Sequence, residues 1–113
     1  MLTEALALVD QHEEPFHEAE LYRLKGELLH IQSADNQLEA EICFQKAISI
    51  ARHQSAKSWE LRAATSLARL WQQQGQRAEA YALLLPVYSW FTEGFDTADL
   101  MDAKRLLDKL TST

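Results

Sequence analysis

The chain has 113 residues, a formal net charge of −6 and 47% hydrophobic residues, which suits one small domain. It contains 18 Leu and 16 Ala but only 2 Val and 4 Ile, with three Gly and two Pro. This composition favours an all-α fold and all but excludes an all-β or loop-rich one. Residues 1–50 carry 10 acids and 3 bases, and residues 51–113 carry 7 acids and 8 bases. Since neither part has a basic surplus, we expect no nucleic-acid partner.

Apolar residues at helical spacing predict three helices in the first half of the chain. They lie within residues 1–14, 16–32 and 37–54. Asn36 and Glu39 are spaced as a capping box for the third. The second carries two adjacent apolar stripes, so it is expected to pack on both sides, as in a layered array. The two stripes comprise Leu21, Leu24, Leu28 and Ile31, and beside them Tyr22, Gly26 and Leu29.

Three more helices are predicted in the second half of the chain. The fourth covers residues 58–74, and Gly75 is expected to end it in a left-handed conformation. The fifth covers residues 77–92 and contains Pro86, where we expect a kink or a break because proline lacks the amide donor. The last covers residues 98–110.

An internal repeat relates these helices, with offsets of 42 residues for one helix and 40 for the next. Each copy has a small residue where two helices would cross and a large residue one turn later. The matched positions are Tyr22, Gly26 and Leu29 against Ala64, Ala68 and Trp71, and Ala40, Phe44 and Ala47 against Ala80, Leu84 and Val87.

This pattern resembles the tetratricopeptide repeat (TPR). The resemblance implies a right-handed array of antiparallel helix pairs, in which residues 1–14 are a partial upstream helix and residues 96–111 a C-terminal capping helix. Repeat one would cover residues 16–54 and repeat two residues 56–92. The repeat is longer than the usual 34 residues and lacks the usual proline after its second helix, so HEAT-like helix pairs are an alternative.

A second resemblance covers most of the chain. Residues 19–29, 56–64 and 90–95 are similar to the C-terminal repeat tail of bacterial signalling ATPases associated with adenylate or guanylate cyclase domains. The resemblance implies a regulatory docking module within such a signalling protein. The nucleotide-binding and cyclase motifs of that family are absent here, so its catalysis cannot be assigned to any residue of this sequence.

A partner-binding groove is predicted from the same arrangement, since the first helix of each pair lines the concave face of such repeats. Its residues are those left after both buried stripes are removed. Two arginines of the fourth helix could bind carboxylates, which suggests an acidic or extended peptide, whereas a solvated face is the plain alternative. The predicted groove residues are Arg23, Glu27, His30, Arg62, Thr65, Arg69 and Gln72.

No enzymatic site is predicted. The sequence has no glycine-rich phosphate loop, and its histidines lack neighbours at metal-ligand spacing. We therefore expect no catalytic residue, metal or cofactor, and a protein or peptide partner, which could be another domain of the same parent protein. The alternative is an anionic small molecule sensed in a pocket around Arg69, Trp71 and Tyr81.

Three further expectations concern location and assembly. Cys43 is the only cysteine, so it is expected to be a buried thiol in a reducing cytoplasm. The apolar run at residues 2–9 is interrupted by Glu4 and is too short to span a bilayer, so no membrane association is expected. The apolar face of the first predicted helix lacks a partner helix, which suggests a homodimer through exposed terminal helices.

Overall fold

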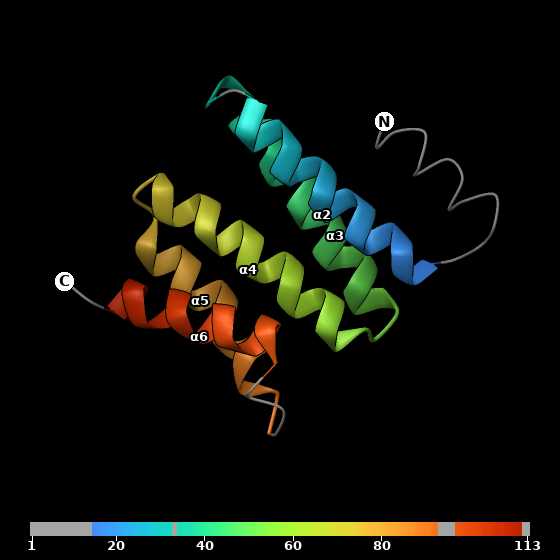
Figure 1. Cartoon of the computed structure of the whole chain (residues 1–113), viewed down its shortest axis with the longest axis vertical. Coiled ribbons are helices and arrows are strands. Elements are labelled where there is room, and N and C mark those ends of the chain that lie inside the picture. Colours follow the sequence, from blue (N-terminus) through green and yellow to red (C-terminus); the bar gives the residue numbers. More distant parts are fainter. Residues whose placement is uncertain (1–14, 33, 93–96, 112–113) are drawn as a thin grey trace.

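The fold is all-helical, as the composition predicts (Figure 1). The computed structural model describes residues 15–32, 34–92 and 97–111, and these contain five α-helices, one 3-10 turn and no strand. The predicted helix within residues 1–14 lies outside the described residues. Helix bounds agree with the predicted ones to within three residues. The elements are α2 (Pro15–Gln32), η1 (Ala34–Asn36), α3 (Gln37–His53), α4 (Lys57–Gln73), α5 (Arg77–Ser89) and α6 (Ala98–Thr111).

Helix α4 lies at the centre and packs against each of the other four α-helices (Figure 1). Its sequence explains this position, because its small and large apolar residues lie on more than one side of the helix. Small residues allow neighbouring helices to approach, and leucines fill the space between them. The buried apolar residues of α4 are Leu61, Ala63, Ala64, Leu67, Ala68 and Leu70.

The predicted crossing points are close contacts. A Cβ atom placed on Gly26 of α2 would lie 2.6 Å from the ring of Phe44 and 3.1 Å from the backbone oxygen of Ala40, both on α3. Ala68 of α4 and Ala80 of α5 are both fully buried in the core where these two helices pack. Both helix pairs thus carry small residues at buried positions, and at Gly26 there is no room for a larger one.

Two helices end in the same way. At the end of α4, Gly75 has a φ of +82°, its N–H donates to the carbonyl of Gln72, and the next N–H donates to Trp71. This is the left-handed end predicted there. At the end of α3, Ser55 has a φ of +55° and makes the corresponding bond to Arg52.

Two local features differ from the prediction. Asn36 makes no side-chain cap hydrogen bond, because it ends the 3-10 turn at φ −88° and ψ 7° instead of the extended conformation of an N-cap. Helix α5 continues through Pro86 without a break, although it ends at Ser89, three residues before the predicted end.

Candidate functional site

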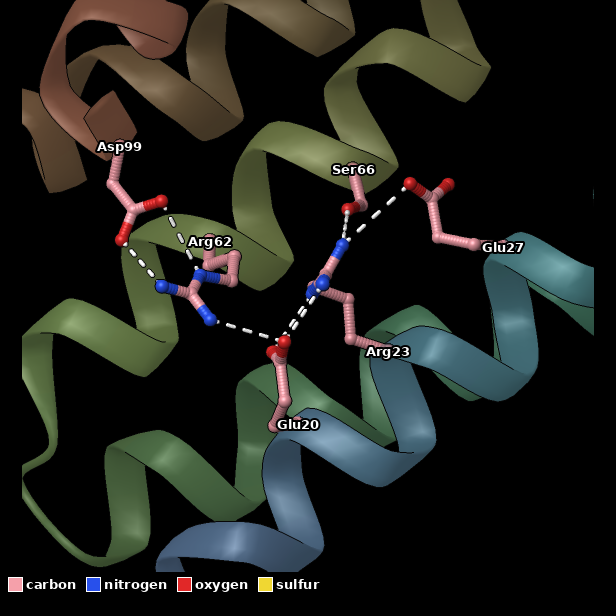
Figure 2. A network of polar contacts seen from close by, with 6 residues as sticks. All are labelled: Glu20, Arg23, Glu27, Arg62, Ser66 and Asp99. Carbon is pink, nitrogen blue, oxygen red and sulfur yellow. Dashed lines mark hydrogen bonds and ion pairs between the residues drawn. The ribbon is translucent and has the colours of Figure 1, made fainter. Parts of the chain in front are cut away.

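Six polar side chains from three helices form one network, named here the arginine network (Figure 2). Two arginines are its centres, and each binds carboxylates of the chain itself. Because α2 and α6 both contact α4, their polar faces meet over the same part of α4. The members are Glu20, Arg23 and Glu27 of α2, Arg62 and Ser66 of α4, and Asp99 of α6.

Arg62 joins three helices. Its Nη1 donates to Glu20 at 3.0 Å, and its Nη2 and Nε donate to the two carboxylate oxygens of Asp99 at 2.9 and 3.3 Å. The hydrogen bond to Asp99 outweighs the opposing effect of burial and, with the contact to Glu20, raises the pKa of Arg62. The guanidinium also lies 5.1 Å from the ring centroid of Trp59, within cation–π range.

Arg23 is also engaged within the chain. Its Nε and Nη2 donate to the two oxygens of Glu20 at 2.8 and 2.7 Å. Its Nη1 donates to the hydroxyl of Ser66 at 3.3 Å and lies 3.6 Å from Glu27. The side chains of Arg23 and Glu20 are only 15% and 17% exposed, so this bidentate pair is shielded from solvent.

A pocket of about 280 Å³ lies beside the arginine network. Its lining includes four of the predicted groove residues, which are Arg23, Arg62, Thr65 and Arg69. The buried hydroxyl of Thr65 donates to the carbonyl of Leu61 at 2.8 Å, so three of the four are satisfied within the chain. Arg69 differs, because in the described part of the chain no carboxylate or other acceptor contacts its guanidinium.

The other predicted groove residues lie nearby. Glu27 is paired with Arg23, and Nε2 of His30 lies 2.6 Å from Oε1 of Gln73, which links α2 to α4. Gln72 lines a separate pocket. The structure therefore brings the predicted residues onto one face but commits most of them to contacts with one another.

That separate pocket, named here the basic pocket, lies between α4 and α6 and has a volume of about 290 Å³. Its only ion pair among the described residues joins Arg105 to Asp102 at 3.0 Å. With three cations and one carboxylate, its lining carries a local charge of +2. The lining residues are Arg69, Gln72, Gln73, Asp102, Arg105, Leu106 and Lys109.

Arg105 and Lys109 were not predicted as groove residues. Their place near the end of the last helix predicts only that they complement its dipole. The signal that could have found them is the apolar seam of that helix, which sets the face that packs on α4. Both residues lie beside this seam, which comprises Leu100, Ala103, Leu106, Leu107 and Leu110.

The aromatic residues lie elsewhere. Trp71 lines a pocket of about 310 Å³ with side chains of α3 and α5, and its Nε1 donates to Glu41 at 2.9 Å. Tyr81 packs against the core. Arg69 and Trp71 line different pockets, so the structure does not bring together the three residues predicted for an anionic effector.

Other candidate chemistry is limited. Cys43 is buried, as predicted, and desolvation by burial raises the pKa of its thiol. Within the described residues no three His, Cys, Asp or Glu side chains are grouped so that they could hold a metal ion. None of the described helices is both long and apolar enough to cross a membrane.

Comparisons of the chain with protein-family models, with curated protein sequences and with solved structures found no match. The polar face of α2, α4 and α6 is therefore the feature of the molecule that bears on function.

Proposed function

We propose that this chain is a non-enzymatic protein-interaction module that binds a protein or peptide partner through the face of α2, α4 and α6. In this proposal the helices are a right-handed TPR-like array, and the chain is the C-terminal part of a cytoplasmic bacterial signalling protein of the cyclase and ATPase type. The partner could be another domain of the same protein.

One observation carries the proposal. Helices α2, α4 and α6 present polar side chains to two adjacent pockets, and Arg69 lines both of them. A row of neighbouring pockets across three helices is suited to an extended ligand, because each helix can contribute one set of contacts.

A small anionic effector is the second candidate function, and the local charge of the basic pocket favours it. Citrate would then raise the melting temperature in a thermal-shift assay, and the rise would be smaller in Arg69→Gln. No shift at millimolar citrate would contradict this candidate.

Site-specific photocrosslinking tests the main proposal. A benzoylphenylalanine at Gln72, in the basic pocket, is compared with one at Ser49, which is exposed on α3. We expect one partner to be crosslinked from the source cells at Gln72 and not at Ser49, and the purified partner to bind the unmodified chain. Equal crosslinking at both positions, or none at either, would contradict a binding face on α2, α4 and α6.

A further inference from the structure

We propose that the basic pocket is a carboxylate-binding site, in which Arg69 and Lys109 receive an acidic side chain of the partner. The proposal rests on the proposed function only for the source of the carboxylate. It differs from the sequence prediction, which assigned this role to Arg62 and Arg69 together.

The arginine network is not available for this role. The guanidinium of Arg62 already binds Glu20 and Asp99, and that of Arg23 binds Glu20, with Glu27 beside it. An incoming carboxylate would have to displace one that is already bound, so it would gain little free energy there.

Arg69 and Lys109 are the two cations of the basic pocket that form no ion pair among the described residues. Over the ranges 15–32, 34–92 and 97–111, neither side chain has an ion pair or hydrogen bond. Arg69 is half-buried between two pockets, so its planar fork is held on α4 with part of its solvation already removed. Lys109 is exposed one helix away, on the last turn of α6.

The rest of the pocket suits a carboxylate. Oε1 of Gln73 faces Nε2 of His30, which leaves the amide NH₂ group of Gln73 as a donor. Buried Leu106 supplies an apolar surface in the same lining. The chain as a whole has a charge of −6, so any attraction of an anion must come from this local arrangement.

A defined peptide tests the site. The probe is an acetylated and amidated (Glu-Gly)₄ peptide with a tetramethylrhodamine label, and its matched control is (Gln-Gly)₄. Binding is followed by fluorescence anisotropy at low ionic strength, where exposed charges are least screened. We expect the wild-type chain to bind the glutamate peptide and not the glutamine peptide.

Three variants locate the binding. Arg69→Gln and Lys109→Gln should each weaken it by about tenfold, since each removes one charge-assisted contact. Lys104→Gln is the matched control, because it removes the same charge from α6 at a lysine that is 2.7 Å from Asp108 and lies outside the pocket. Arg69 has no partner among the described residues, so its variant should keep the wild-type melting temperature.

The outcomes separate this proposal from the proposed function. No binding of the glutamate peptide, or equal weakening in Lys104→Gln and Arg69→Gln, would overturn the carboxylate site. If Arg69→Gln leaves partner crosslinking at Gln72 unchanged, the partner binds without this contact and only the carboxylate site fails. If the peptide binds as expected but no partner is crosslinked, the site stands and the proposed function fails.

Discussion

Gly26 shows how closely α2 and α3 approach. An alanine there would place a Cβ atom 2.6 Å from the ring of Phe44, which is itself fully buried. Although alanine favours helix by about 1 kcal/mol, overpacking costs more, so we expect Gly26→Ala to lower the free energy of unfolding by about 1–2 kcal/mol. Urea denaturation followed by circular dichroism measures the change.

The same substitution in a Phe44 variant tests whether contact with the Phe44 ring causes this loss of stability. In the Phe44→Leu variant the ring is absent, so adding Gly26→Ala should lower the free energy of unfolding far less. The higher helix propensity of alanine then favours a net stabilisation. If the glycine substitution carries the same penalty in both backgrounds, the contact with Phe44 is not what requires a glycine.

Ser55 and Gly75 occupy corresponding positions after α3 and α4, both with positive φ. A residue with a Cβ atom is strained in this conformation by about 1–2 kcal/mol. Glycine removes that strain, but it loses more conformational entropy on folding, which offsets part of the gain in stability. We therefore expect Ser55→Gly to stabilise the fold by about 0.5–1 kcal/mol. Gly75→Ser should destabilise it by a similar amount, although no atom lies within 4 Å of the added Cβ. Thermal unfolding measures both, and an unaffected Gly75→Ser would exclude backbone strain as the cause.

The same two residues show what a sequence reveals at this scale. Gly75 was predicted because glycine is the usual residue in a left-handed helix end. Ser55 gave no such signal, since serine is common in many turns. Asn36 failed for the opposite reason: its residue type suits a cap, but the 3-10 turn before α3 leaves it in the wrong conformation.

Helix α5 tolerates Pro86 in its interior, where the ring removes one backbone hydrogen bond and crowds the carbonyl of Ala82. Replacing it with alanine restores the donor and should raise the free energy of unfolding. We expect a gain of about 2 kcal/mol for Pro86→Ala, after allowing for the more flexible unfolded chain. Chemical denaturation measures it. A loss of stability would mean that packing of the proline ring beside Val87 and Trp90 outweighs the missing bond.

Arg62 links α2, α4 and α6, so its removal should loosen the contacts between these helices. Arg62→Gln leaves Asp99 without an ion-pair partner among the described residues. We expect it to lower the free energy of unfolding by about 1 kcal/mol at low salt and by less in 0.5 M salt. Arg105→Gln is the control, because its pair with Asp102 is more than half exposed and should contribute under about 0.5 kcal/mol. Equal effects of the two variants in urea denaturation would contradict a linking role for Arg62.

At the scale of the helices, prediction succeeds where the signal is local. Apolar periodicity and turn residues gave the bounds of all five described helices to within three residues. The basic pocket was missed because it depends on how α6 lies against α4, which no local pattern specifies. Arg62 and Arg69 look alike in the sequence, seven residues apart on one helix. The positions of α2 and α6 give Arg62 two carboxylate partners, whereas Arg69 has none among the described residues.

At the scale of the whole molecule, five of the seven large apolar side chains that are exposed among the described residues belong to α2 and α3. Ile31 and Leu38 are 79% and 69% exposed. Small proteins seldom leave a continuous apolar face uncovered unless it contacts something. We call this surface the apolar face. It comprises Leu24, Leu28 and Ile31 of α2 and Leu38 and Ile42 of α3.

We propose that the apolar face binds the same face of a second copy of the chain. Lys25 of α2 and Glu39 and Lys46 of α3 place charges of both signs on these two helices. A two-fold axis can bring opposite charges together around an apolar centre. We therefore expect a dimer at high micromolar concentration in sedimentation-velocity experiments with the full chain.

Charge substitutions test whether the apolar face is responsible. Ile31→Lys with Ile42→Lys should abolish the dimer and keep the helical signal, because both side chains are already exposed and add little to the core. Met101→Lys is the control, since Met101 is an exposed apolar residue of α6, outside the apolar face. If Met101→Lys dissociates the dimer equally, the contact lies elsewhere. If the wild-type chain is a monomer at every concentration, the face does not join two copies, and its exposed leucines and isoleucines must contact a different molecule or another part of the same chain.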